Sequence, residues 1–264
     1  MIPKIIHYTW FSGEHYPPKV QECIDSWAKY LPDYKLKLWD MDAVKDIDSI
    51  FLQEALSVRK WAFAADFVRQ WAVYNEGGIY LDTDVMVYKS FDNFLHYRAF
   101  IGEEPYINYA FGRTFKTLTS QCFGAEKGHP FVKSCLDYYE GRHFITSKNE
   151  NLPVQFRYDQ TLAPLIQAEI ARQYSFDWAL SKSKTIQACD TGLTIFPSQY
   201  FDNNRWTKIT PETVCTHLTL NSWRDSISDK QEKVSLKERI FFRFVLPYLR
   251  KFLWRLKYVV IRFD

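Results

Sequence analysis

Two aspartates two residues apart, Asp82 and Asp84, directly follow a short apolar run at residues 79–81. The run is β-prone and predicts a buried strand, with a break at Gly77-Gly78 before it. Two carboxylates this close repel each other unless a proton or a cation lies between them. Oxygen ligands suit Mg²⁺ or Mn²⁺ carrying substrate phosphates, so the spacing indicates a metal–diphosphate site at the carboxyl end of a strand. The alternative for such a triplet taken alone is a solvated turn. The side chains of Asp82 and Asp84 point to one side if the strand continues through them, and they diverge if the chain turns.

Upstream of the glycines, residues 55–76 favour a helix, because they combine helix formers with an apolar stripe and no proline. Asp66 and Arg69 are three residues apart and share a face of it. They indicate either an ordinary ion pair worth about 0.2–0.5 kcal/mol or a carboxylate and a guanidinium aimed at a ribose hydroxyl and a phosphate.

The amino-terminal residues 2–13 predict a first strand that runs into a loop at Trp10. The indole there either stacks on a nucleotide base or packs at the rim of the core. The segment has neither the apolar run nor the cleavage site of a signal peptide.

The whole chain has 264 residues, of which 47% are hydrophobic and 18% aromatic, enough for one sizeable core with pockets that stack on sugar rings and bases. Strand-like and helical stretches alternate, which favours an α/β fold. Five cysteines without a Cys-x-x-Cys pair predict neither a zinc site nor a disulfide framework. No Asn-x-Ser/Thr sequon is present, so we expect a cytoplasmic protein.

The carboxyl-terminal residues 235–264 carry eight Lys or Arg against two acids, a net charge of +6, whereas the remainder carries −3. Aromatic and aliphatic residues alternate with these charges, and no run approaches the ~20 apolar residues of a spanning helix. The tail therefore predicts basic amphipathic helices, divided at Pro247, that lie peripherally on the inner face of the cell membrane. The alternative is a helix that docks on the catalytic domain. Nucleic acid is not an expected partner, because no nucleic-acid motif accompanies the charge.

Several segments together resemble glycosyltransferase family 32, the group of capsular-polysaccharide sugar transferases and the yeast initiating mannosyltransferase. The segments are Ile5–Trp10, Ala65-Asp66-x-x-Arg69, Gly77–Asp84, Ser26-Trp27, Pro32–Tyr34, Trp39-Asp40, Gly124–Phe131, and His217 with Ser222-Trp223. The resemblance covers about residues 1–225 in fixed order. More distantly, the chain is similar to the glucosyltransferase domain of large clostridial toxins.

The resemblance implies a GT-A fold, with a Rossmann-like nucleotide-binding half and a mixed central sheet. The domain is expected at 1–228, with a donor half at about 1–110 and an acceptor half at about 111–228, followed by the tail at 229–264. The implied reaction is a retaining, Mn²⁺- or Mg²⁺-dependent transfer of a hexose from a nucleotide sugar, UDP-galactose or UDP-glucose. The expected acceptor is a glycan on a lipid carrier, in bacterial capsular or surface polysaccharide synthesis.

Carried over residue by residue, the resemblance assigns Trp10 to the base and places Asp84 and His217 on the metal. Catalytic roles are expected for Asp82, Asp84 and Asp159. Contacts with the nucleotide sugar are expected for Trp10, Asp66, Arg69, Tyr80, Asp82, Asn108, Gln160, Ser222 and Trp223. Asp159 has a second interpretation as the N-cap of a helix beginning at Gln160. The closing block departs from the family, because it lacks the second His and the Trp that often follow the first His.

Two rival functions share parts of this pattern. A haloacid-dehalogenase-type phosphatase also has Asp-x-Asp after a strand, but it needs Thr or Val where this chain has Met86. A catalytically silent glycan- or lipid-binding protein on the same fold is the other rival, and retention of Asp66, Arg69, Asp82, Asp84 and His217 disfavours it.

Overall fold

The computed structural model describes residues 1–110, 113–152, 156–178, 185–202 and 209–220. Residues 1–107 and 115–220 form one compact unit, and residues 108–114 with 221–264 form a second. The fold and the site described below belong to the first unit. Ser222, Trp223, the tail and the side chain of Asn108 lie outside the described residues. The predictions for them, and the domain boundary at 228, stay predictions.

The first unit is built on a seven-stranded sheet in the order β2-β1-β3-β6-β5-β8-β7. β1 pairs in parallel with β2 and β3, and β5 pairs in parallel with β8. β3 is antiparallel to β6, and β7 is antiparallel to β8. The strands are β1 (Ile5–Thr9), β2 (Lys35–Trp39), β3 (Gly78–Leu81), β5 (Ala99–Ala110), β6 (Arg113–Ala125), β7 (Gln187–Ala188) and β8 (Leu193–Phe196). The predicted α/β class with a mixed central sheet is confirmed.

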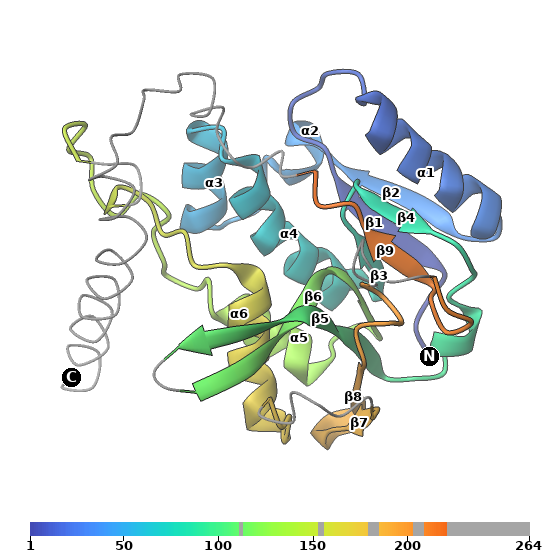
Figure 1. Cartoon of the computed structure of the whole chain (residues 1–264). Coiled ribbons are helices and arrows are strands. Elements are labelled where there is room, and N and C mark those ends of the chain that lie inside the picture. Colours follow the sequence, from blue (N-terminus) through green and yellow to red (C-terminus); the bar gives the residue numbers. More distant parts are fainter. Residues whose placement is uncertain (111–112, 153–155, 179–184, 203–208, 221–264) are drawn as a thin grey trace, which may run out of the picture. The chain divides into compact units, whose positions relative to one another are not determined.

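A separate two-stranded ribbon pairs β4 (Val85–Val87) with β9 (Cys215–His217) in antiparallel register. The α-helices are α1 (Pro18–Tyr30), α2 (Met41–Val44), α3 (Ile50–Ser57), α4 (Trp61–Glu76), α5 (Pro130–Asp137) and α6 (Ala163–Ala171). Short 3₁₀ turns lie at Asp92–Phe94, Arg172–Tyr174 and Asp190–Gly192. Figure 1 shows α1 and α4 on opposite sides of β1 and β2, so the sheet is covered on both faces.

The alternation of side chains along β3 separates the two layers of the core. Tyr80 packs in the cluster that contains the buried residues of α3, α4, α5 and α6. Ile79 and Leu81 point the other way and pack with Trp27 of α1 and with Val85 of β4. All of β3 is buried, as the apolar run predicts. The buried strand therefore fixes the positions of Asp82 and Asp84, which follow its end.

The predicted single helix at 55–76 is wrong in its extent, because the structure divides the segment into α3 and α4. The chain turns at Arg59, which adopts the left-handed conformation with φ of 56°, and Lys60 donates its backbone N–H to the carbonyl of Ala55. The turn lets the two helices pack against each other. Neither glycine nor proline marks it, so propensity alone carried no signal.

The predicted helix after Asp159 begins later than expected. Its N-cap is Leu162, and α6 begins at Ala163 with Pro164 in the first turn, where proline is favoured. Asp159 instead accepts hydrogen bonds from the backbone N–H and hydroxyl of Thr161. It therefore fixes the turn before the helix and is not its cap.

Among the residues that the structure describes, none of the helices has the length and hydropathy required to span a bilayer.

Candidate metal and nucleotide-sugar site

The Asp-x-Asp motif forms a turn, but the carboxylates of Asp82 and Asp84 approach each other and do not diverge. β3 ends at Leu81, and Val85 donates its N–H to the carbonyl of Asp82 at 3.0 Å. Asp82 itself remains tied to the sheet, because its N–H bonds the carbonyl of Gln121 in β6 at 2.9 Å. The turn starts the β4 strand, so Asp84 lies between the sheet and the ribbon.

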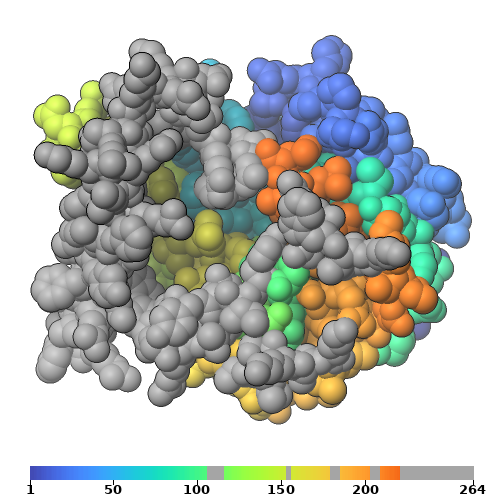
Figure 2. Space-filling view, in the orientation of Figure 1, coloured from blue at the N-terminus to red at the C-terminus, as the bar shows by residue number. Residues whose placement is uncertain are grey.

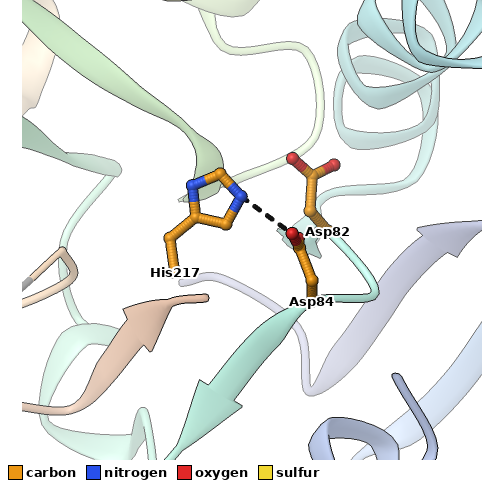
Figure 3. A group of neighbouring side chains, drawn as sticks. All are labelled: Asp82, Asp84 and His217. Carbon is orange, nitrogen blue, oxygen red and sulfur yellow. Dashed lines mark ion pairs between the residues drawn. The ribbon is translucent and has the colours of Figure 1, made fainter. Parts of the chain in front are cut away.

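The β4–β9 ribbon brings a histidine 133 positions downstream to this turn. Val85 pairs with His217, and the N–H of Leu218 bonds the carbonyl of Asp84 at 2.9 Å. The imidazole Nε2 of His217 lies 3.1 Å from Oδ1 of Asp84 (Figure 3), and Oδ2 accepts the N–H of Leu220 at 3.0 Å. Asp84 is thus held from two sides by one short segment.

The ligand atoms of Asp82, Asp84 and His217 lie within 4.8 Å of one another. Two donors across a single Mg²⁺ ion are about 4.2 Å apart, since each bond is 2.0–2.1 Å long. The carboxylate oxygens of Asp82 and Asp84 suit Mg²⁺ or Mn²⁺. The predicted metal ligands Asp84 and His217 are therefore brought together, and Asp82 joins them.

The charges of this cluster are partly balanced within the protein. Burial opposes ionisation of Asp84, but the hydrogen bond and charge of His217 outweigh it and lower the pKa of this carboxyl. Burial likewise opposes protonation of His217, yet Asp84 raises the pKa of the imidazole to about 9. A cation that binds Nε2 must displace this proton, so metal binding and proton release are coupled.

Behind Asp82, a buried network joins α4 to the sheet. The Nη2 atom of Arg69 lies 2.9 Å from Asp66 and 3.2 Å from Asp82, and the hydroxyl of Tyr80 donates to Asp82 at 2.9 Å. Arg69 also donates from Nε to the carbonyl of Ala65 and from Nη1 to Ser120. Its guanidinium is therefore surrounded by protein acceptors, and it orients Asp82.

The electrostatics of the network follow from burial. Loss of water raises the pKa of Asp66 to about 7, although the nearby Arg69 works against this shift. Burial, reinforced by the Asp82 charge, raises the pKa of Tyr80, so the phenol stays a donor. Tyr80 is 0% exposed and reaches the site only through its hydroxyl, which also lies 3.2 Å from Thr9. Direct contacts of Asp66, Arg69 and Tyr80 with a donor stay predictions.

Trp10 lies immediately after β1, as predicted, on a partly exposed loop. Its indole N–H donates to the carbonyl of Glu14 at 2.7 Å, and its ring meets Tyr16 edge-on at 5.0 Å. Figure 2 shows orange atoms of the segment that contains His217 at the surface, beside the blue amino-terminal residues. The stacking of Trp10 on a base stays a prediction.

The structure does not connect Asp159 and Gln160 with the metal cluster. Asp159 contacts Thr161 and has Arg142 at 3.9 Å, and Gln160 is exposed. Their roles beside the sugar stay predictions.

Residues that the sequence did not single out also border the cluster. Ser120 and Thr9 complete the polar contacts of Arg69 and Tyr80. Asp202 is 7% exposed and interacts with His217, and burial, opposed by that contact, raises the pKa of Asp202 to about 6. Its position at the end of a turn after β8 follows no motif, so only the tertiary structure places it here.

Comparison with known proteins yields three curated relatives. The chain is 34% identical over 136 residues to inositol phosphoceramide mannosyltransferase 3 of Schizosaccharomyces pombe, an alignment covering 50% of this chain and 35% of that protein. It is 29% identical over 136 residues to uncharacterized glycosyltransferase L373 of Acanthamoeba polyphaga mimivirus (49% and 52%). It is 26% identical over 197 residues to mannosyl phosphorylinositol ceramide synthase SUR1 of Saccharomyces cerevisiae (71% and 46%). The chain thus spans about half or less of the length of these relatives.

Similar solved structures include the PaToxG glycosyltransferase, with a TM-score of 0.42 and 19% identity over 65% of this chain and 69% of that one. A glycosyltransferase involved in glycosylation of the major capsid of PBCV-1 has a TM-score of 0.44 and 13% identity, covering 81% and 93%.

The segment that matches a protein family includes the aspartate pair. Residues 17–101 match the family described as the glycosyltransferase sugar-binding region containing a DXD motif. Asp66, Arg69, Asp82 and Asp84 fall inside this segment, and Trp10 and His217 fall outside it. The turn that holds Asp82 and Asp84 therefore lies in the part of the chain that is similar to a glycosyltransferase sugar-binding region containing a DXD motif.

Proposed function

We propose that this chain is a metal-dependent glycosyltransferase of GT-A type that transfers a hexose from a nucleotide sugar to a hydroxyl of a glycan acceptor. The observation that carries the proposal is the convergence of Asp82, Asp84 and His217 within 4.8 Å at the carboxyl end of β3. It is supported by the match of residues 17–101 to a DXD sugar-binding region. Retention of the anomeric configuration is part of the proposal.

Each acid has a distinct environment that suits a distinct role. Asp84 is held by His217 and by the N–H of Leu220, which favours the anionic carboxylate that a cation requires. Oδ1 of Asp82 accepts a hydrogen bond from the hydroxyl of Tyr80 and pairs with the guanidinium of Arg69. Oδ2 is therefore the oxygen that can contact a cation or a sugar hydroxyl. A divalent cation held between them would stabilise the negative charge on the departing nucleoside diphosphate.

The donor and acceptor classes are proposed from the sequence resemblance and the relatives' names. The resemblance favours UDP-galactose or UDP-glucose. Two curated relatives are instead named as an inositol phosphoceramide mannosyltransferase and a mannosyl phosphorylinositol ceramide synthase. Those names support an acceptor that is linked to a lipid. We therefore propose a hexose donor and a lipid-linked acceptor, with the basic tail, outside the described residues, at the surface of the membrane.

Donor binding tests the proposal directly. Purified protein is titrated with UDP-glucose, UDP-galactose and GDP-mannose, with Mn²⁺ or with EDTA, and tryptophan fluorescence is followed. We expect quenching by one donor class that needs Mn²⁺ and weakens about tenfold or more in Asp84→Asn, because one ligand charge is lost. Trp10→Ala should weaken binding as well, by about 1–3 kcal/mol for a lost stacking contact.

The control is Asp137→Asn, which removes an exposed carboxylate of α5 that pairs with Lys133. This variant should bind the donor as wild type does. Absence of binding to every donor, with and without metal, would refute the proposal. Hydrolysis of the bound donor, lost in Asp84→Asn, separates an enzyme from a silent sugar-binding protein.

A further inference from the structure

The strand that carries His217 has one edge without a strand partner in the described ribbon. Its hydrogen bonds to β4 alternate: Tyr88 donates to the carbonyl of Val214, and Leu218 donates to that of Asp84. Backbone groups of successive strand residues point to opposite edges. The N–H of His217 therefore points away from β4, toward the neighbouring segment 200–202.

Segment 200–202 covers this edge residue by residue. The carbonyl of Tyr200 accepts the N–H of Val214 at 2.8 Å, and the carbonyl of Phe201 lies 3.4 Å from the thiol of Cys215. The carboxylate of the next residue, Asp202, interacts with the backbone N–H of His217 and with its imidazole. Successive residues of the segment thus contact residues 214, 215 and 217 in turn.

The segment is anchored firmly enough to hold the strand. Phe201 is fully buried among Phe91, Phe94 and Phe100, and the N–H of Asp202 bonds the carbonyl of Ser198 at 2.8 Å. Asp202 itself is 7% exposed. Burying a carboxylate is costly unless it makes compensating contacts, so its placement against a metal-ligand candidate needs a reason.

We propose that Asp202 is a positioning residue of the metal centre, which fixes His217 through its backbone and adds negative potential behind the imidazole. This inference rests on the proposed function. The β4–β9 ribbon is short, and without this contact the N–H of His217 would lose its buried acceptor. The imidazole would then no longer be held at one place opposite Asp84, and outer contacts of this kind tune metal affinity.

The test compares Asp202→Ala and Asp202→Asn in the full chain. At pH 8, Mn²⁺ binding is followed by the electron paramagnetic resonance signal of the free ion. We expect Asp202→Ala to weaken Mn²⁺ binding at least about tenfold. Asp202→Asn should recover part of this loss, because its amide oxygen still accepts the N–H although its charge is gone.

Glu104→Gln is the matched control for charge. Glu104 is also largely buried and interacts electrostatically with both Asp202 and His217, but its side chain bonds Thr117 and not β9. The variant should bind Mn²⁺ within about twofold of wild type. A loss equal to that of Asp202→Ala would mean that general negative charge, and not positioning, governs affinity, and it would overturn the inference.

Hydrogen–deuterium exchange of the metal-free protein provides a readout that does not depend on the proposed function. The His217 amide should exchange slowly in wild type and Asp202→Asn but faster in Asp202→Ala, while the β4-paired amides of Thr216 and Leu218 serve as references. Unchanged exchange would overturn the inference even if the variants bind Mn²⁺ differently. If wild type fails to bind Mn²⁺ while its His217 exchange responds as expected, the metal-dependent function fails and Asp202 retains only its backbone contact. If Asp202→Ala does not fold, the Mn²⁺ affinities of Asp202→Asn and Glu104→Gln are compared instead. A loss in Asp202→Asn no larger than that in Glu104→Gln would overturn the inference.

Discussion

Arg69 is the residue on which the charges of the site converge. It lies within 2.9 Å of Asp66 and 3.2 Å of Asp82, and its side chain is only 6% exposed. The remaining N–H groups go to Ala65 and Ser120, and its plane lies over the ring of Tyr80, 4.8 Å from the centroid. One buried cation therefore compensates two carboxylates, and the simple helical ion pair that the spacing allows accounts for only part of its contacts.

Replacing Arg69 by Met should destabilise the protein by about 3–5 kcal/mol, because it leaves buried carboxylates without their partner. Urea unfolding followed by circular dichroism measures the change. The apolar side chain keeps much of the volume, so the loss reports mainly the missing charge and hydrogen bonds.

Arg98→Met is the comparison for this prediction. Arg98 also pairs with a carboxylate, Glu126, but its side chain is 54% exposed. Such a surface pair contributes about 0–1 kcal/mol. Equal losses in the two variants would show that the buried network has no special role.

The junction between α4 and β3 depends on two glycines that adopt backbone conformations closed to other residues. Gly77 has φ of 70° and ψ of 178°, and Gly78 has φ of 113°. A Cβ on Gly77 would lie 2.8 Å from the backbone nitrogen of Lys127. These constraints direct the chain from the helix into the strand and so place Asp82 at the site.

Gly77→Ala should cost about 3 kcal/mol of folding free energy, since the strained conformation and the clash with rigid backbone add to each other. Gly128→Ala is the matched variant, because Gly128 has φ of 75° with nothing within 4 Å of its Cβ position. It should cost only about 1 kcal/mol. Chemical unfolding of both variants checks the difference, and similar costs would mean that the contact with Lys127 is relieved without strain.

At the scale of the whole molecule, His7 joins the first two strands of the sheet to the end of α4. The indole N–H of Trp39 in β2 donates to Nδ1 at 3.1 Å, so Nε2 carries the proton and donates to the carbonyl of Gly77 at 2.8 Å. Both nitrogens are used in the neutral form. Burial, only partly opposed by the Gly77 contact, lowers the pKa of His7 below its usual 6.5.

This shift predicts a loss of stability in acid. The unfolded chain takes up the proton near pH 6.5, whereas the folded protein takes it up only at lower pH, so folding is weakened as the pH falls below about 6.5. The stability difference between wild type and His7→Asn should therefore narrow between pH 7 and pH 5, as measured by urea unfolding. His15→Asn, at an exposed position, should leave the wild-type profile unchanged. A constant difference between wild type and His7→Asn would contradict the prediction.

Local patterns in the sequence predict much of this molecule. The glycine pair, the apolar residues 79–81 and the two aspartates predicted a strand end with a cation site. β3 and its turn confirm the strand end, and the approach of Asp82, Asp84 and His217 fits a cation site that stays a prediction. The alternation of elements predicted an α/β fold, which the mixed sheet confirms. These features depend on backbone conformation and side-chain period, and both are local properties of the chain.

Contacts between distant segments needed the tertiary structure. The break at Arg59 carried no glycine or proline, and it forms because two apolar helices pack against each other. His217 was expected at the metal only through a family resemblance, and β4–β9 pairing is what brings it to Asp84. Asp202 followed no motif, since its role depends on which backbone N–H the edge of β9 leaves free. The residues of the DXD turn are thus determined by the sequence, whereas their partners are decided by strand pairing and burial across the fold.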